Sequence, residues 1–183
     1  LLFNCQEGLE AKVTGPFGRL TLPEKIPGRL VMVATSVGLA PYMPILKELE
    51  TRGFPEVVLL LGVRDRSEFI YGDVLKDYAQ RHDYFDLRLC LSRGKATAGY
   101  EHDGYVNAQI ERLGVNPESD HFLLCGNPEM IDDAWGYLKK SGFKAKNVVR
   151  EKYVFARESR SSAKALTAEH KQLIADKLKK YGK

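Results

Sequence analysis

The chain has 183 residues, which is enough for one full domain and some additional segments. Its hydrophobic content of 44% and charged content of 28% are ordinary for a globular protein, and no run approaches the roughly 18 apolar residues of a membrane-spanning helix. The formal net charge of +4 favours an acidic partner, but the sequence lacks the basic stripe with interleaved aromatic residues that is typical of nucleic-acid binding.

The three cysteines form no C-x-x-C unit and cannot all pair with one another, so we expect a reducing, cytoplasmic setting. The four histidines are dispersed and lack the spacing of metal ligands. We therefore expect no metal site.

The first 25 residues have a β pattern. Residues 8–22 alternate polar and apolar side chains around a Gly15-Pro16-Phe17-Gly18 turn. The chain has no initiator Met and begins with what looks like the last strands of a preceding β domain. We therefore expect a fragment or processed product of a longer protein.

From Arg29 onward, short apolar runs alternate with segments of helical periodicity. The predicted strands are Leu30–Ala34, Val57–Gly62, Asp86–Leu91, His121–Cys125 and Asn147–Val149 or a little beyond. The predicted helices are Tyr42–Arg52, Asp73–Arg81, Tyr105–Leu113 and Pro128–Ser141. This alternation is typical of an α/β fold, and it predicts a doubly wound, Rossmann-like parallel sheet of five strands flanked by helices over residues 26–156.

Residues 157–183 change in character. The polar run from Arg157 to Ser162 predicts a linker, and Thr167 is a candidate N-cap for a short basic helix with one apolar side. We expect this helix to dock on its own domain, with a partner- or membrane-binding arm as the alternative.

Two loops at predicted strand ends carry candidate ligand chemistry, because ligands of doubly wound sheets bind beyond the carboxyl ends of the strands. The loop after the first strand contains Thr35, Ser36, Val37, Gly38 and Pro41. The loop after the fourth contains Cys125, Gly126, Asn127, Pro128 and Met130. A ligand there would meet glycines that allow close backbone approach and the free N–H groups of helix starts.

The end of the third strand carries Ser92 and Arg93. A hydroxyl donor beside an arginine fork suits a phosphate monoester. Arg64, which follows the second strand, could help to bind the same phosphate. Arg64 could equally be an ordinary surface arginine, and the alternative for Arg93 is an exposed loop arginine.

Together, the two glycine-containing loops resemble the TGTGIAP-type and CGxPxM-type loops of the ferredoxin–NADP reductase family, and the resemblance covers residues ~8–156. It implies that Thr35–Pro41 passes under the pyrophosphate and nicotinamide, and that Ser92-Arg93 holds the 2′-phosphate of NADP. Ser36 stands where the family has glycine, and Val37 replaces a residue with a hydroxyl group.

The segment Gly104-Tyr105-Val106-Asn107 resembles the family's K-x-Y-[IV]-Q segment. There the tyrosine stacks on adenine and the amide, here Asn107, contacts the same end of the nucleotide. Asp103 occupies the place of the lysine, which removes a positive charge from the phosphate pocket. The resemblance therefore favours NADP, with NAD as the alternative.

At the nicotinamide end, the resemblance implies roles for Cys125, Glu151 and Tyr153. The thiol would pack where nicotinamide meets flavin, the tyrosine would stack on the flavin, and the glutamate would belong to the hydrogen-bonding cluster at that spot. Phe155 would lie near the flavin edge. Without the resemblance, Cys125 is a buried strand-end cysteine, and Tyr153 and Phe155 are ordinary edge-strand aromatics.

The function that the resemblance implies is that of an FAD-dependent ferredoxin/flavodoxin–NADP reductase. Residues 1–25 would be the last strands of an FAD-binding barrel and residues 26–156 the NAD(P)-binding domain, so we expect little reductase activity from this chain alone. Ferredoxin or flavodoxin would be the electron-transfer partner. The alternatives are an NADH-dependent reductase component of an oxygenase, a cytochrome-b5-reductase-like enzyme, and, in another class, a non-catalytic nucleotide-binding docking module.

Overall fold

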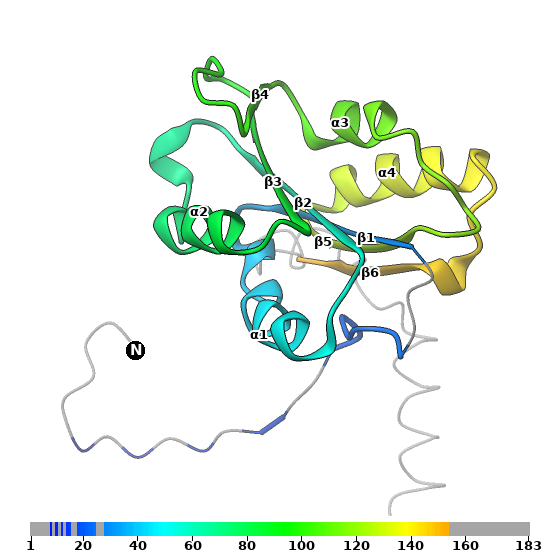
Figure 1. Ribbon diagram of the computed structural model, residues 1–183, viewed down its shortest axis with the longest axis horizontal. Helices are drawn as coiled ribbons and strands as arrows, with labels where there is room; N and C mark the ends of the chain where they lie inside the picture. Colours follow the sequence, from blue (N-terminus) through cyan, green and yellow to red (C-terminus); the bar gives the residue numbers. More distant parts are fainter. Residues whose placement is uncertain are drawn as a thin grey trace, which may run out of the picture.

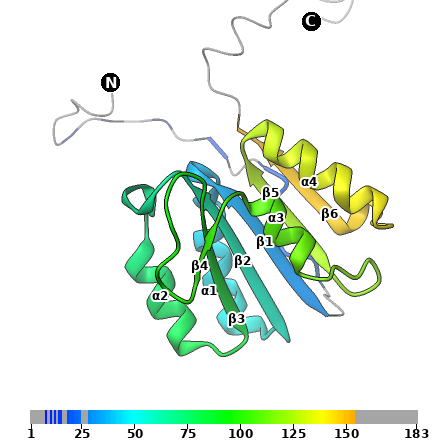
Figure 2. The same ribbon diagram turned by 90° about the horizontal axis from the view of Figure 1, so that it is seen from above.

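The computed structural model describes residues 18–24 and 28–153, together with positions 8, 10, 12, 14 and 15. Within these ranges, an all-parallel sheet of six strands has the order β4-β3-β2-β1-β5-β6 (Figures 1 and 2). The strands are β1 (Arg29–Thr35), β2 (Glu56–Val63), β3 (Phe85–Leu91), β4 (Glu101–Asp103), β5 (His121–Gly126) and β6 (Val148–Lys152). The α-helices are α1 (Tyr42–Arg52), α2 (Gly72–Arg81), α3 (Val106–Arg112) and α4 (Pro128–Lys140), and the short 3-10 helices are η2 (Ser36–Leu39), η3 (Arg66–Glu68) and η4 (Ala145–Asn147).

The central strands are buried on both faces, which is why they consist of nearly unbroken apolar runs. Leu30, Met32 and Ala34 of β1 contribute to one core cluster, which also contains apolar residues of α1 and α2. Val31 and Val33 belong to the other cluster, with apolar residues of α3 and α4. The molecule therefore has three layers, with α1 and α2 on one face of the sheet and α3 and α4 on the other (Figure 1).

Helix α1 is fixed to the sheet by the buried Tyr42. Its hydroxyl lies 3.0 Å from the carbonyl oxygen of Val33 and 2.7 Å from that of Leu123, which belong to adjacent strands. Burial raises the pKa of Tyr42 well above its ordinary value, so the hydroxyl stays protonated and can donate. This contact sets the position of the helix that follows the loop after β1.

The sheet has six strands, so the prediction of five was wrong. The additional strand, β4, pairs parallel with β3 through the Leu89–Leu91 register. Its three residues, Glu101, His102 and Asp103, are all polar and show no apolar alternation that could have predicted a strand. Strand β6 continues past Val149 to Lys152, in line with the open end predicted for it.

Residues 18–24 contain no helix or strand but contact the domain. Leu20 and Leu22 pack partly buried against the core cluster on the α1 side. Arg52 at the end of α1 donates to the carbonyl oxygens of Pro23 and Glu24 at 2.7 and 2.8 Å. Positions 9, 11, 13, 16 and 17 of the strand pattern predicted over residues 8–22, the predicted helix beginning at Thr167, and Phe155 lie outside the described residues. None of the helices in the described ranges has the length and apolar character needed to cross a membrane.

Candidate functional site

The strand order reverses between β1 and β5, and the loops that follow these two strands meet at the carboxyl edge of the sheet. Thr35 Oγ1 accepts a hydrogen bond from the backbone N–H of Asn127 at 2.9 Å. Gly126 has a φ of +132°, and a Cβ atom added there would lie 2.3 Å from Thr35 Oγ1. Only glycine allows this approach, so the two loops form one packed unit.

Gly38 makes the second close approach at this junction. A Cβ atom on Gly38 would lie 2.3 Å from the carbonyl oxygen of Cys125 and 2.9 Å from Gly126 Cα. The η2 turn therefore rests directly on the end of β5. The two predicted glycines pack against protein backbone, in addition to any approach they allow to a ligand.

Ser36 and Val37 lie on the exposed side of η2. Ser36 adopts a left-handed conformation with a φ of +50°, the region that favours glycine, and it is the position where the family pattern has glycine. Val37 is 51% exposed and presents an apolar surface beside the loop junction. Pro41, at the N-cap of α1, is partly buried behind them.

The sequence predicts free backbone N–H groups at the start of α4, but in the structure these groups are already hydrogen-bonded within the chain. Asn127 Oδ1 accepts from the N–H groups of Glu129 and Met130 at 2.8 and 3.3 Å, and Pro128 has no N–H to offer. The N–H of Asn127 itself is bound to Thr35. The helix start is therefore capped by its own side chain, and this part of the prediction was wrong.

Cys125, Glu151 and Tyr153 come together at the ends of β5 and β6. Cys125 is fully buried, and burial raises the pKa of its thiol to about 11. The Tyr153 side chain lies close enough to this thiol to influence its pKa, and the Tyr153 N–H donates to the carbonyl oxygen of Gly126 at 2.9 Å. The cysteine is a neutral thiol near pH 7, which makes it a packing group and a poor nucleophile.

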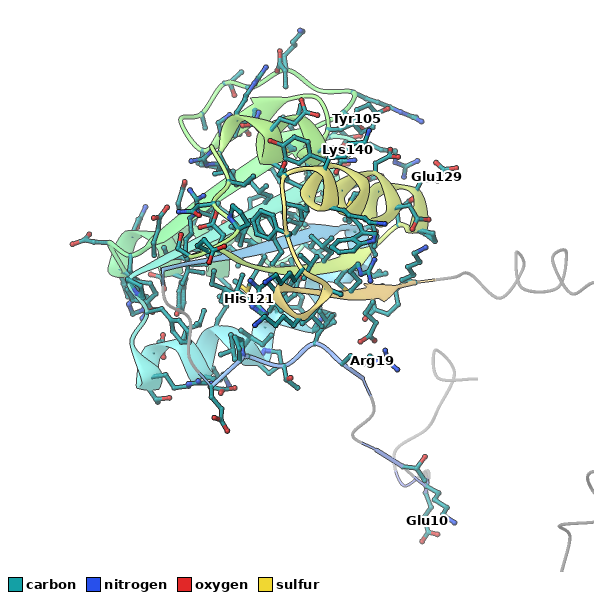
Figure 3. All side chains as sticks on the ribbon, turned by 90° about the vertical axis from the view of Figure 1, so that its right-hand side faces the viewer. Glu10, Arg19, Tyr105, His121, Glu129 and Lys140 are labelled. Carbon is teal, nitrogen blue, oxygen red and sulfur yellow. The ribbon has the colours of Figure 1, made fainter. Side chains whose placement is uncertain are left out.

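Glu151 extends this group toward the N-terminal segment. Its carboxylate accepts from the backbone N–H of Arg19 at 3.2 Å, and Figure 3 shows Arg19 close to the end of β6. A Cβ atom on Gly18 would lie 3.2 Å from the same carboxylate. Burial raises the pKa of Tyr153, and the negative charge of Glu151 adds to this rise. Residues 18–19 therefore reach the same edge of the sheet as the candidate site.

The candidate phosphate residues lie at the ends of β2 and β3. The Ser92 N–H donates to the carbonyl oxygen of Val63 at 3.0 Å, and the Arg93 N–H donates to that of Arg64 at 2.8 Å. These bonds continue the pairing of the two strands past their ends and place Arg64 next to Arg93. The Arg64 guanidinium also forms an ion pair with Glu68 and is 60% exposed.

Tyr105 and Asn107 flank the start of α3. Tyr105 is 73% exposed and offers an open ring face. Asn107 is turned toward α4, where its Nδ2 donates to the carbonyl oxygen of Met130 at 3.5 Å, and its buried Oδ1 has no partner within the described part of the chain. The ring is accessible to a ligand, whereas the amide is largely engaged within the domain.

The structure also shows two ion pairs near the candidate site that no sequence motif predicts. In the first, Lys95 Nζ donates to Asp103 at 3.0 Å, and the Ala96 N–H donates to the same carboxylate at 2.7 Å. Glu101 is buried and forms an ion pair with Arg66. No spacing in the sequence predicts either contact, because both depend on β4 lying beside β3.

A parallel sheet whose carboxyl edge gathers two packed glycine loops, an exposed tyrosine ring and a serine–arginine pair defines a nucleotide-binding α/β domain. Residues 32–135 match the family model described as "Oxidoreductase NAD-binding domain". The chain belongs to this family, the nucleotide-binding domain of the ferredoxin–NADP reductase family.

Curated relatives include both ferredoxin–NADP reductases and oxygenase components. The ferredoxin–NADP reductase of Azotobacter vinelandii is 28% identical over 78% of this chain and 62% of its own length. The toluate 1,2-dioxygenase electron transfer component of Pseudomonas putida is also 28% identical, over 80% of this chain and 43% of its own length.

Among solved structures, a ferredoxin NADP⁺ reductase from Neisseria gonorrhoeae with bound FAD and NADP superposes with a TM-score of 0.64 at 28% identity. The match covers 74% of this chain and 61% of that one. The chain therefore spans less than two thirds of the length of these relatives.

Proposed function

We propose that this chain is the NADP(H)-binding part of a ferredoxin/flavodoxin–NADP reductase-like oxidoreductase. NADP(H) would lie along the carboxyl edge of the sheet, with its 2′-phosphate at Ser92 and Arg93 and its nicotinamide at the junction of the loops after β1 and β5. The observation that carries this proposal is the placement of Arg93 beside Arg64 on the same sheet edge as the Gly38–Gly126 junction.

Several side chains of the described residues could bind the adenosine end of the nucleotide. The arginine forks of Arg64 and Arg93 can each donate to phosphate oxygens, with the Ser92 hydroxyl as a neutral donor. The open ring of Tyr105 can stack on the adenine. Lys95, paired with Asp103, brings a positive charge into the loop that follows Arg93 and offsets the carboxylate that replaces the family's lysine.

At the nicotinamide end, the chain would contribute positioning and electrostatics. The neutral, buried thiol of Cys125 would pack beneath the nicotinamide ring, and Tyr153 would cover the same place when the nicotinamide is absent. Gly38 and Gly126 let the two loops pack directly against each other, and the ring would lie against this junction. FAD, when bound, supplies the hydride-accepting chemistry.

The domain boundaries also belong to this proposal. Residues 1–25 would be the end of an FAD-binding barrel, and its contact with residues 26–156 would run through Glu151 and the backbone of Gly18 and Arg19. Phe155 would lie near the flavin edge. Ferredoxin or flavodoxin would receive or supply the electrons in the complete, cytoplasmic protein.

An NADH-dependent reductase component of an oxygenase is the second candidate. It is favoured by Asp103, because a carboxylate near the adenosine end disfavours the additional phosphate of NADP. The similarity to the toluate dioxygenase component supports the same alternative.

Calorimetric titration of the 183-residue chain with NADP⁺ and NAD⁺ distinguishes the two. We expect tighter binding of NADP⁺, and Arg93→Ala should weaken NADP⁺ binding about 10- to 100-fold with little effect on NAD⁺, since charge-assisted hydrogen bonds contribute about 1.5–3 kcal/mol. Arg81→Ala, which removes an exposed arginine of α2, is the matched control and should leave both affinities unchanged. Equal or stronger binding of NAD⁺ would contradict the NADP proposal and favour the NADH-dependent reductase.

A further inference from the structure

The loop between β3 and β4, residues 92–100, begins with the candidate phosphate residues and is held in place by carboxylates of β4. Its first two N–H groups, on Ser92 and Arg93, donate to carbonyl oxygens at the end of β2. In its middle, Lys95 Nζ and the Ala96 N–H donate to Asp103. The next two residues, Thr97 and Ala98, are bound by Glu101.

Glu101 is the most highly coordinated carboxylate of the described residues. Its side chain is only 2% exposed and forms a bidentate pair with Arg66, whose Nε and Nη2 donate at 2.6 Å each. It also accepts from the backbone N–H groups of Thr97 and Ala98 at 2.7 and 3.0 Å. The hydrogen bond to Arg66 is the main cause of the lowered pKa of Glu101, about 2, so the carboxylate is ionised under all ordinary conditions.

Arg66 joins three segments of the chain. It belongs to η3, which follows β2, and its Nη2 donates to the carbonyl oxygen of Lys95 and to Thr97 Oγ1 at 2.8 Å as well as to Glu101. The guanidinium therefore ties the middle of the 92–100 loop both to the segment that follows β2 and to β4. A lysine ammonium lacks this rigid planar fork and cannot make the same set of contacts.

We propose that the Arg66–Glu101 pair is a positioning device that sets the geometry of the 92–100 loop and thereby holds Ser92 and Arg93 for the 2′-phosphate of NADP(H). This inference rests on the proposed function. In this proposal neither residue contacts the nucleotide. They act through the loop, so their loss should weaken the binding of NADP⁺ and leave that of NAD⁺, which lacks the 2′-phosphate, nearly unchanged.

A purely structural role of the pair would affect stability and both affinities together. A second buried carboxylate–arginine pair, Asp120 with Arg29, is a matched control that separates a purely structural role from the positioning role. Asp120 has a side chain only 3% exposed, accepts from Arg29 at 2.7 Å, and also accepts from the Asn116 N–H at 2.8 Å. It precedes β5 at the opposite, amino edge of the sheet, so Asp120→Asn should lower stability without changing nucleotide selectivity.

The test is the ratio of NAD⁺ to NADP⁺ dissociation constants of the full chain, measured by calorimetry for wild type, Glu101→Gln, Arg66→Lys and Asp120→Asn, with thermal unfolding of each. We expect the ratio to fall about tenfold in Glu101→Gln and Arg66→Lys, a change equal to about 1.4 kcal/mol, and to stay at the wild-type value in Asp120→Asn. Arg66 is 46% exposed, so Arg66→Lys provides the result if Glu101→Gln fails to fold.

The failures of the two proposals are distinguishable. A wild-type chain that prefers NADP⁺, with an unchanged ratio in the folded Glu101 or Arg66 variant, overturns the positioning role alone. An equal fall of the ratio in Asp120→Asn also overturns it. A wild-type chain that shows no preference for NADP⁺ overturns the proposed function and the positioning role with it.

Discussion

The side-chain oxygen of Thr35 accepts a hydrogen bond from the backbone N–H of Asn127 at 2.9 Å, across 92 positions of sequence. This bond joins the two loops that the family pattern identifies and fixes the carboxyl edge where the strand order reverses. The loops are therefore a preformed unit of the domain. Their geometry is set by packing within the chain before a nucleotide arrives.

The close packing of this unit makes Gly38 sensitive to substitution. Gly38→Ala would place a Cβ atom 2.3 Å from a carbonyl oxygen of β5, so we expect the free energy of unfolding in urea to fall by about 3 kcal/mol. Gly136→Ala in α4 is the control, because nothing lies within 4 Å of its Cβ position. That variant should gain about 0.5–1 kcal/mol. Equal stability of the two variants would contradict the packing described here.

Ser36 tests the left-handed conformation of η2. A β-branched side chain is strained at a φ of +50°, so Ser36→Val should lower the free energy of unfolding by about 1–2 kcal/mol. Ser36→Gly, which restores the family residue, should not lower it. Chemical denaturation of both variants measures the difference, and a Ser36→Val chain as stable as wild type would show that the turn has another conformation.

Burial of Cys90 and Cys125 predicts slow modification of both thiols. Burial raises the pKa of Cys90 to about 12 and that of Cys125 to about 11, so in a Cys5→Ser background iodoacetamide at pH 8 should label neither residue quickly in the folded chain. Both should react after unfolding in guanidinium. Fast labelling of folded Cys125, measured by mass spectrometry, would show a reactive thiol at the nicotinamide end.

Because the Cys125 thiol is buried, the stability of the fold should depend on pH in the alkaline range. A thiol that stays protonated in the folded chain and ionises in the unfolded chain stabilises the fold fully only below the unfolded pKa. Stability should therefore fall as the pH rises above about 9, the ordinary value for cysteine. Cys125→Ala should reduce this pH dependence in urea titrations between pH 8 and pH 10. An identical slope in the variant would contradict burial as the cause.

Burial of His121 predicts a loss of stability at acid pH, in contrast to the loss at alkaline pH that the buried thiol causes. Its Nε2 is buried without a hydrogen-bond partner in the described chain, and burial lowers its pKa below the ordinary 6.5. Because the unfolded chain binds the proton more readily, stability should fall as the pH drops below 6.5. His121→Leu should show a smaller loss between pH 7 and pH 5.5. A loss as large as that of the wild type would assign the acid sensitivity to other groups.

The main elements of the fold could be predicted from sequence because their signals are local. Strand β1 is a continuous apolar run buried on both faces, and α1 has the predicted bounds, Tyr42–Arg52. Strand β4 could not be predicted, because its polar residues become a strand only through pairing with β3.

In the candidate site, too, contiguous motifs could be predicted from the sequence, whereas contacts between distant residues could not. The glycine loops and the Ser92-Arg93 pair are contiguous motifs, so the sequence locates them. The Arg66–Glu101 pair joins residues 35 positions apart and follows from the register of β4, which no pattern reports. The capping of α4 by Asn127 also escaped prediction, because the same residue type could either cap the helix or leave its N–H groups to a ligand.

The most direct test of the account is an amide chemical-shift map of the ¹⁵N-labelled chain titrated with NADP⁺ and, separately, with NAD⁺. We predict that both nucleotides perturb the loops after β1 and β5 and the start of α3 at Tyr105, and that Arg64, Ser92 and Arg93 shift strongly with NADP⁺ alone. Perturbations centred on the opposite, amino edge of the sheet, or identical maps for the two nucleotides, would contradict an NADP(H) site at the carboxyl edge.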